Sequence, residues 1–247
     1  RMSNPYESRR LVGEYLFFHY AGFAEAAGDL PVPREAWGFA ERVVSELLRD
    51  SVSMESALDV GCAVGRSSFE LARLAQRVVG VDYSKAFIDA AKALQTEGSM
   101  SGEVLAEGER MQEFTARVPE GVERGRVEFL VGDATDLPEL GAFDVVLAAN
   151  LICRLPEPRK FLTRAPSLVK PGGQLLLATP FSWLEEFTPR EHWLGGRQDS
   201  PSSFEVLRQI LEPDFELETT KNLPFLIREH SRKFQYGISL GSRWRRR

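Results

Sequence analysis

The sequence has little cysteine, little histidine and no long apolar run. Only two of its 247 residues are cysteines, Cys62 and Cys153, which is too few for a disulfide framework and typical of a reducing compartment. No segment reaches the roughly 18–20 apolar residues that a membrane span needs, and no signal-peptide pattern begins the chain. We therefore expect a cytoplasmic protein that does not bind to or cross a membrane.

Positive charge and metal ligands are scarce as well. The chain has 31 Lys and Arg against 36 Asp and Glu, a formal net charge of −5. This balance argues against a nucleic-acid partner, although the last five residues include four arginines: Arg243, Arg245, Arg246 and Arg247. Three scattered histidines and two cysteines give no metal-ligand spacing, so no metal is expected. The expected partner is a small molecule.

From residue 35 onward, helix-like and strand-like segments alternate. Apolar residues recur at helical spacing over 35–49, and Ser84 is a candidate N-cap for a helix that reaches Leu94. Alternation of this kind predicts an α/β fold in which a mostly parallel sheet has helices on both faces. The other predicted elements are helices at 66–76 and 157–169, strands at 57–60, 78–82, 126–131, 143–149 and 174–179, and a turn at 171–173.

Three regions depart from this alternation. Residues 1–34 are rich in aromatic side chains, 97–125 are polar, and 181–200 contain Trp183 and Trp193 without clear periodicity. Insertions at strand ends often shape a substrate pocket, so we expect all three regions to border one, with 1–34 as an aromatic lid. No repeat or linker divides the chain, which predicts a single domain over 1–247.

The strongest motif is DVGCAVGR at 59–66, between a predicted strand and a predicted helix. Small residues there let the backbone approach a ligand at the carboxyl edge of the sheet. Asp82 follows Gly61 by 21 residues, where a carboxylate can accept both hydroxyls of a ribose. Asp133 and Asn150 follow two further strands. The ordered set predicts a cofactor that contains a nucleoside.

A dinucleotide site fits this motif poorly, because Gly61 and Gly65 are four residues apart with Ala63 between them. The set instead resembles the class I S-adenosylmethionine-dependent methyltransferases, whose first motif is an acid followed by Gly-x-Gly-x-Gly. The resemblance implies a Rossmann-like, seven-stranded, mostly parallel sheet whose last strand is antiparallel. It also implies S-adenosyl-L-methionine as cofactor and S-adenosyl-L-homocysteine as product. The residues it assigns to the cofactor are Asp59, Gly61, Cys62, Ala63, Gly65, Ser67, Asp82, Tyr83, Asp133, Ala134 and Asn150.

In this assignment Asp59 and the turn at 61–65 hold the aminoacyl end of the cofactor, and Asp82 holds its ribose. Asp133 and Ala134 meet the adenine edge, and Tyr83 flanks the adenine face, where stacking is favourable.

Further strings resemble a narrower family. They are NPYE at 4–7, EYLFFHY at 14–20, ANLICRL at 149–155, TPFSW at 179–183, HWLGG at 192–196 and LPFLIRE at 223–229. Together they are similar to the methyltransferases of ovothiol biosynthesis, which methylate an imidazole nitrogen of 5-thiohistidine to give ovothiol A. In many members this domain is fused to an iron-dependent sulfoxide synthase, which makes such a synthase a candidate partner here.

The residues that act on the substrate are predicted from chemical type. Asn150, Arg154 and His19 are the catalytic candidates: the amide follows a strand at the cofactor edge, the guanidinium matches a carboxylate or thiolate, and an imidazole can take up a proton. His192 is the alternative proton acceptor. The predicted substrate-binding residues are Tyr6, Tyr15, His19, Tyr20, Asn150, Arg154, Trp183 and Arg228.

Other functions remain open at this point. A class I methyltransferase for another small amine, imidazole or thiol would have the same cofactor motifs. A non-catalytic module that binds S-adenosylmethionine and supports a sulfoxide synthase would also keep them. An NAD-dependent oxidoreductase is disfavoured by Ala63 and by the 61–65 spacing.

Overall fold

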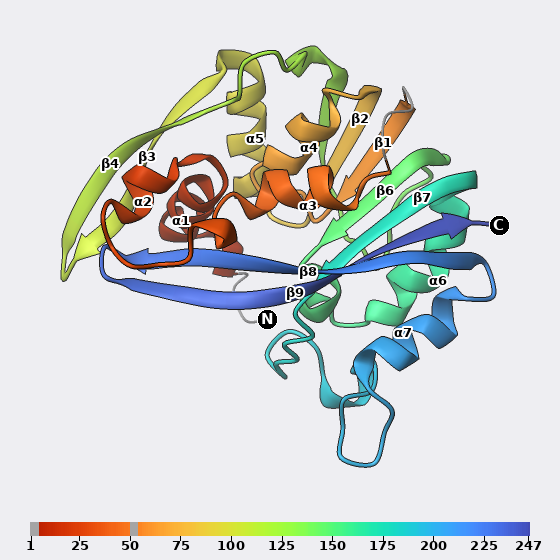
Figure 1. Cartoon of the computed structure of the whole chain (residues 1–247). Coiled ribbons are helices and arrows are strands. Elements are labelled where there is room, and N and C mark those ends of the chain that lie inside the picture. The colour runs from red at the N-terminus through yellow and green to blue at the C-terminus, as the bar shows by residue number, and fades with distance from the viewer. Residues whose placement is uncertain (1–4, 50–53) are drawn as a thin grey trace.

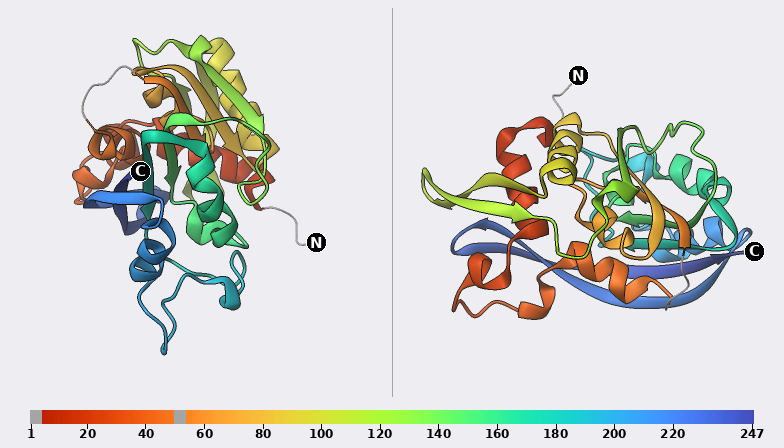
Figure 2. Two further views of the ribbon diagram at one scale, coloured as in Figure 1. Left: turned by 90° about the vertical axis from the view of Figure 1, so that its right-hand side faces the viewer. Right: turned by 90° about the horizontal axis from the view of Figure 1, so that it is seen from above.

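The computed structural model describes residues 5–49 and 54–247. Residues 1–4 of the predicted lid, including Asn4 of the NPYE string, lie outside the described residues. A seven-stranded sheet has the order β5-β2-β1-β6-β7-β9-β8, with helices on both faces (Figures 1 and 2). Its strands are β1 Met54–Val60, β2 Ala75–Asp82, β5 Val127–Val131, β6 Phe143–Ala149, β7 Val169–Thr179, β8 Phe215–His230 and β9 Lys233–Arg246.

The strand directions confirm the predicted class I methyltransferase fold. Neighbouring strands from β5 across to β7 pair in parallel. The last strand of the chain, β9, lies between β7 and β8 and is antiparallel to both. The carboxyl ends of the parallel strands therefore meet at one edge of the sheet, where open α/β folds bind ligands.

Side chains that alternate along each strand supply two hydrophobic cores. In β1, Ala57 belongs to the core under α1, α3, α4 and α5, whereas Leu58 and Val60 belong to the core under α6 and α7. The helices are α1 Arg9–Tyr20, α2 Phe23–Ala27, α3 Phe39–Leu47, α4 Arg66–Leu71, α5 Lys85–Glu97, α6 Pro158–Leu168 and α7 Ser203–Leu211. Single 3-10 turns are η1 Pro5–Glu7, η2 Arg34–Ala36, η3 Arg124–Arg126, η4 Ile152–Arg154 and η5 Arg190–His192.

Helix ends differ from the predictions for local reasons. The helix predicted over 35–49 is divided by Gly38, whose φ of 72° is left-handed and begins α3. The helix predicted over 66–76 ends at Leu71, because residues from Ala75 onward already pair in β2. Ser84 caps α5 as predicted. Within the described ranges, none of the helices has the length and apolar character to cross a membrane.

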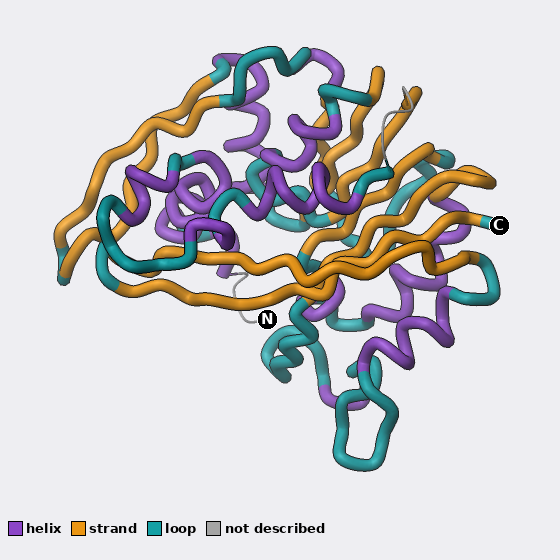
Figure 3. The backbone as a smooth tube through the Cα atoms, viewed as in Figure 1, coloured by secondary structure: helices purple, strands orange, loops and turns teal. Residues whose placement is uncertain are grey.

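The polar segment 97–125 forms a separate antiparallel hairpin of β3 Ser99–Glu107 and β4 Arg110–Arg117 (Figure 3). Phe114 packs edge-on against Phe17 of α1, with ring centroids 5.0 Å apart. No residue of the hairpin lines the large cavity described below, so the prediction that 97–125 borders a substrate pocket is wrong. Its inward side chains instead cover α1.

The arginine-rich end of the chain lies in β9 and has an ordinary electrostatic explanation. Arg243 donates to Glu218 at 2.9 Å, and Arg245 forms ion pairs with Glu216 and Glu218 on the neighbouring strand β8. Arg246 pairs with Asp214 at 3.2 Å. The basic residues are thus balanced by acids across one hairpin.

Candidate active site

A cavity of about 1150 Å³ opens at the carboxyl edge of the sheet. Its volume is ample for a nucleoside cofactor together with a small second molecule. Because β1, β2, β5 and β6 end at this edge, their following loops meet there. The predicted site residues that line it are Tyr6, Tyr15, His19, Asp59, Gly61, Cys62, Ala63, Ser67, Asp82, Tyr83, Asp133, Ala134, Asn150 and Arg154.

The loop after β1 has a backbone that requires small residues. Gly61, Ala63 and Gly65 have φ values of 76°, 46° and 86°, all left-handed. A Cβ on Gly65 would lie 2.7 Å from the Phe129 ring, which shows why this position has no side chain. Gly65 does not line the cavity, so it supports the cofactor loop by packing rather than by contact.

Asp82 holds two segments of the site together. Its carboxylate accepts the backbone N–H of Ala63 at 2.8 Å and that of Ser84 at 2.9 Å, one on each oxygen. Burial raises the pKa of Asp82, and the two N–H donors oppose that rise. Each oxygen retains a lone pair, so the carboxylate can also accept the two hydroxyls of a ribose.

Asp59 is the most buried carboxylate of the site. Its exposed fraction is 1%, and the Ser68 hydroxyl donates to it at 2.6 Å. Burial raises the pKa of Asp59 to about 7. A carboxyl group in this position gains most from a cationic ligand, as the ammonium of an aminoacyl group would supply.

We expect cofactor affinity to rise with pH because of Asp59. Below its pKa of about 7 the group is protonated and cannot pair with an ammonium, so the dissociation constant of S-adenosylhomocysteine should increase about tenfold per pH unit from 7 to 5. Calorimetric titration of the wild type and of Asp59→Asn measures this. The variant should bind more weakly with a flatter profile, and an equally flat wild-type profile would remove Asp59 from the ammonium site.

The raised pKa of Asp59 also determines how the stability of the fold changes with pH. The folded value of about 7 exceeds the ordinary 3.8, so the folded chain binds this proton more tightly than the unfolded chain. The contribution of Asp59 to stability is therefore complete below pH 3.8 and is lost as the pH rises through about 7.

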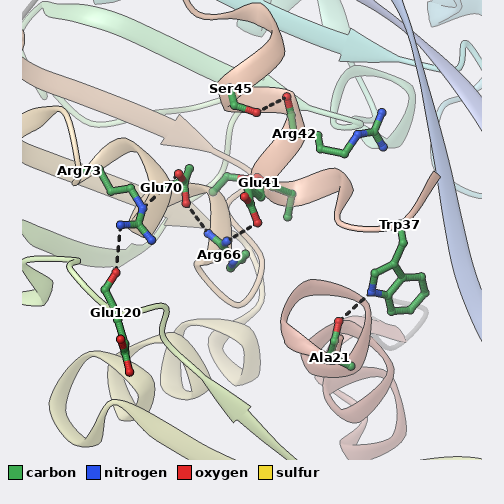
Figure 4. Close-up of polar contacts among 11 residues, drawn as sticks. Ala21, Trp37, Glu41, Arg42, Ser45, Arg66, Glu70, Arg73 and Glu120 are labelled. Carbon is green, nitrogen blue, oxygen red and sulfur yellow. Dashed lines mark hydrogen bonds and ion pairs between the residues drawn. The ribbon is translucent and has the colours of Figure 1, made fainter. Parts of the chain in front are cut away.

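Ion pairs fix the helix that follows the cofactor loop. Arg66, the first residue of α4, is buried and donates to Glu41 on α3 and to Glu70, both at 2.8 Å (Figure 4). The Ser67 hydroxyl donates to the Ala40 carbonyl at 2.6 Å. Ser67 lines the cavity, but its hydroxyl already serves to join α4 to α3.

The adenine end of the predicted site is more open. One oxygen of Asp133 accepts both the backbone N–H and the hydroxyl of Thr135 at 2.7 Å, which leaves its other oxygen for a ligand. Tyr83 lies at the mouth of the cavity with 65% of its surface exposed, as a stacking platform requires. Burial raises the pKa of the Cys62 thiol well above its ordinary value, so this cysteine is a small apolar lining residue at neutral pH.

Aromatic side chains of the N-terminal segment line the cavity. Tyr6 hydrogen-bonds to Arg154 and Tyr15. The Tyr6 ring lies 6.2 Å from Phe187 in a stacked arrangement and 5.7 Å from Phe87. Side chains from η1, α1, α5 and segment 181–200 therefore meet over one end of the site.

Glu7 attaches this segment to α5. Its carboxylate accepts the backbone N–H groups of Lys85 at 2.8 Å and of Ala86 at 3.2 Å, which have no partner inside the helix. The Ser84 hydroxyl donates to the Tyr6 carbonyl at 2.9 Å. The N-terminal cover is thus tied to the strand end that carries Asp82.

Arg154 places a cation at the covered end of the cavity. Its guanidinium donates to the carbonyls of Cys153 at 3.2 Å and Ser182 at 3.1 Å, and lies 4.8 Å from the centroid of Phe187. A guanidinium has five N–H donors, so donors remain for a carboxylate or thiolate ligand.

The burial of His19 disfavours its predicted role as proton acceptor. Burial lowers its pKa to about 3, with a smaller contribution from the charge of Arg66. A base this weak has little driving force to take a proton at neutral pH. The other candidate, His192, lies outside the cavity lining. His19 remains a neutral lining residue whose Nδ1 is buried without a partner among the described residues.

Three predicted substrate residues do not line the cavity, which corrects the predicted set. The Tyr20 hydroxyl donates to the Val64 carbonyl at 2.8 Å, beneath the cofactor loop. The Trp183 indole donates to Ser203 at 2.9 Å, and its ring stacks on Trp193. These bonds hold the two side chains in the protein framework.

The third is Arg228, which faces the opposite side of β8 from the cavity. Its guanidinium donates to the Ala26 carbonyl at 3.3 Å and to Gln112 at 2.8 Å, and lies 4.9 Å from the Phe17 ring centroid. Alternation along the strand explains the error, because Phe225 and Ile227 line the cavity and the next residue must point away.

Arg228→Ala should therefore lower stability without weakening cofactor binding. Loss of two hydrogen bonds from a buried cation should reduce the free energy of unfolding by about 2 kcal/mol. The exposed Arg159→Ala is a control expected to change it by less than about 0.5 kcal/mol. Denaturant unfolding and titration with S-adenosylhomocysteine measure the two effects. An affinity loss in Arg228→Ala beyond its stability loss would restore it to the site.

Further residues that the sequence did not predict also line the cavity. Among them are Glu186 and Phe187 of the irregular segment 181–200 and a group from the β8–β9 hairpin. The hairpin residues are Phe225, Ile227, Gln235, Tyr236, Gly237 and Ile238. The period-2 alternation of Phe225 and Ile227 was the available signal.

The sequence matches known methyltransferases over its central part. Residues 58–177 match the family described as a methyltransferase domain. The chain is 31% identical over 169 residues to the magnesium-protoporphyrin O-methyltransferase of Rhodobacter capsulatus, covering 64% of this chain and 63% of that protein. It is 29% identical over 147 residues to the tRNA U34 carboxymethyltransferase of Idiomarina loihiensis, covering 59% and 38%. The chain thus spans less than two thirds of the length of either relative.

Solved structures share the fold at low sequence identity. A methyltransferase from Methanosarcina mazei has a TM-score of 0.54 and 18% identity, covering 83% of this chain and 96% of that one. The N-methyltransferase NodS from Bradyrhizobium japonicum, solved with S-adenosylhomocysteine, has a TM-score of 0.52 and 15% identity, covering 95% and 98%. Similarity at this level concerns the fold.

The strand order, the left-handed glycine loop and the acids at the ends of β1, β2 and β5 define the class I methyltransferase fold. Residues 58–177, a little under half of the chain, match the methyltransferase-domain family, and the fold agrees with that match.

Proposed function

We propose that the protein transfers the methyl group of S-adenosylmethionine to a ring nitrogen of 5-thiohistidine, giving ovothiol A. The observation that carries the proposal is one cavity lined by two chemically different sets of residues. One set consists of acids and a small-residue loop that suit the cofactor. In the other set, Arg154, Asn150 and the tyrosines Tyr6 and Tyr15 supply charge, an amide and hydroxyls within an aromatic wall.

The cofactor residues fit the proposed donor. Asp59 would pair with its ammonium, Asp82 with its ribose hydroxyls and Asp133 with the adenine amino edge. When bound, S-adenosylmethionine supplies an electrophilic methyl group, so the protein's main contribution is to orient the acceptor and exclude water. The aromatic cover of Tyr6, Tyr15 and Phe187 suits both tasks.

The covered end suits a small zwitterion that contains an aromatic ring. Arg154 can bind a carboxylate through its forked donors, and the ring of the substrate can pack against the tyrosines. The main demand on this pocket is selectivity, since a thiolate is a softer and stronger nucleophile than an imidazole nitrogen. The pocket must therefore hold sulfur away from the methyl group. A sulfoxide synthase that makes the sulfur-bearing substrate is the proposed partner.

Steady-state assays across a substrate panel test this proposal. With S-adenosylmethionine, 5-thiohistidine should be turned over with saturable kinetics, and histidine and 2-thiohistidine much more slowly. Preference for a different amine, imidazole or thiol would support the alternative hypothesis of a class I methyltransferase with another small substrate. Cofactor binding without turnover, even with a sulfoxide synthase present, would indicate the non-catalytic module.

A further inference from the structure

Asn150 is held at the cavity by an uncommon backbone conformation. It directly follows β6, its φ is 53°, and its backbone N–H donates to the Ala178 carbonyl of β7 at 2.7 Å. A left-handed non-glycine residue at the end of a parallel strand is typical of a functional position. The side chain lines the cavity close to the loop that carries Arg154.

A second residue fixes which end of the Asn150 amide faces the ligand. Ser239 of β9 is fully buried, and its Oγ lies 2.6 Å from the amide oxygen Oδ1 of Asn150. The Ser239 hydroxyl has no other hydrogen-bond partner among the described residues. If the amide were reversed, its NH₂ group would donate to Ser239 and the buried hydroxyl proton would have no acceptor. The hydroxyl therefore donates to Oδ1.

The amide nitrogen of Asn150 consequently faces the cavity. Within residues 5–49 and 54–247 it has no hydrogen-bond partner. Across the same residues, the buried side-chain nitrogen and oxygen atoms that lack a partner belong to His19, Arg164 and Arg228. Nδ2 of Asn150 is thus open to the cavity, where it presents two N–H donors.

We infer that Ser239 is a positioning residue that makes Asn150 a hydrogen-bond donor to the sulfur of the substrate. This inference rests on the proposed function. A thiolate accepts hydrogen bonds, whereas a nitrogen that attacks a methyl group needs its lone pair free. The Asn150 amide can therefore bind the sulfur but not the reacting nitrogen. Sulfur held in this way is kept from the methyl group, and the ring turns its other side to the cofactor.

Ser239→Ala removes the hydroxyl that orients the amide. We expect the ratio of S-methylated to N-methylated 5-thiohistidine to increase at least about tenfold, and kcat/KM for N-methylation to fall about tenfold, the usual effect of one lost hydrogen bond. The dissociation constant of S-adenosylhomocysteine should change less than about threefold, which reports that the fold and cofactor site are intact. Ser239→Thr keeps the hydroxyl and should restore the N-selectivity.

Two further variants separate positioning from general damage. Ser242→Ala is the matched control, because Ser242 is also buried on β9 but accepts the Trp244 indole N–H at 2.9 Å. It should keep the wild-type product ratio. Asn150→Asp keeps an acceptor for the Ser239 hydroxyl but replaces the NH₂ donor with an anionic oxygen, so it should lose N-selectivity at least as strongly as Ser239→Ala.

An active wild type and a Ser239→Ala variant with an unchanged product ratio and kcat/KM would overturn the inference. A wild type that does not methylate 5-thiohistidine would refute the proposed function instead. In that case, NMR of the ¹⁵N-labelled protein with S-adenosylhomocysteine tests the positioning role. The side-chain amide signals of Asn150 are assigned by their disappearance in Asn150→Asp. Ser239→Ala should shift or broaden them and Ser242→Ala should not. Unchanged signals in Ser239→Ala would refute the positioning role.

Discussion

Asp82→Asn should weaken binding of S-adenosylhomocysteine at least about tenfold, because one of two charge-assisted hydrogen bonds to the ribose loses its acceptor, at about 1.5 kcal/mol, and the other loses its charge. The substitution has almost the same size, yet it removes more than charge. An asparagine has one acceptor oxygen, whereas the Asp82 carboxylate serves the backbone N–H groups of both Ala63 and Ser84. One of those donors therefore loses its acceptor, and the loop after β1 loses an attachment.

Asp144→Asn is the control for this loss of cofactor affinity, because it replaces another carboxylate that accepts two backbone N–H groups. Asp144, near the start of β6, accepts the backbone N–H groups of Glu55 and Ser56 at 3.0 and 2.9 Å, at the opposite end of the sheet from the cavity. Asp144→Asn should lower stability by about 1 kcal/mol and leave S-adenosylhomocysteine affinity within about threefold. Calorimetric titration compares the two variants. Equal affinities in Asp82→Asn and the wild type would move the ribose site away from Asp82.

Arg154→Gln should reduce kcat/KM for 5-thiohistidine at least about 30-fold, since truncating one partner of a desolvated charge pair costs about 2 kcal/mol or more. The loss should appear mainly in KM if Arg154 binds the substrate carboxylate equally in the ground and transition states. Arg154→Lys keeps the charge but loses the fork, so a loss of about tenfold is expected.

The control for Arg154 is Arg190→Gln. Arg190 also lies near an aromatic ring, 6.0 Å from the centroid of Trp193, but it does not line the cavity. It should keep wild-type kinetics, and both variants should bind S-adenosylhomocysteine normally. Wild-type kcat/KM in Arg154→Gln would show that another group binds the substrate. A parallel loss of cofactor affinity would show that Arg154 mainly maintains the cover.

The cofactor half of the site was predictable because its determinants are local. A strand, a small-residue turn and a helix occupy consecutive residues, and the parallel direction of β1 and β2 brings Asp59 and Asp82 to one edge. Short apolar runs in the sequence, the first of which stops at Gly61, placed these residues at strand ends. The left-handed φ of Ala63 and Gly65 shows why the motif needs small residues.

The substrate half depends on contacts between distant parts of the chain. Ser239 contacts Asn150 across 89 residues, and Arg228 bonds to Ala26 across 202, so no local pattern reports either contact. His19 was chosen for its residue type, but burial lowers its pKa and so disfavours a role as a base. The two halves of the site differ for a physical reason. A local motif specifies backbone geometry, whereas the burial of a side chain and its hydrogen-bond partners depend on the whole fold.

Transfer of a labelled methyl group shows which atom of 5-thiohistidine the protein methylates. The protein is incubated with S-adenosylmethionine carrying a ¹³C-methyl group and with 5-thiohistidine, and long-range NMR correlations locate the labelled carbon in the product. We expect a methyl group on the ring nitrogen nearer the amino-acid side chain, with one S-adenosylhomocysteine formed per product. A methyl group on sulfur, or no transfer by protein that binds the cofactor, would contradict the proposed function.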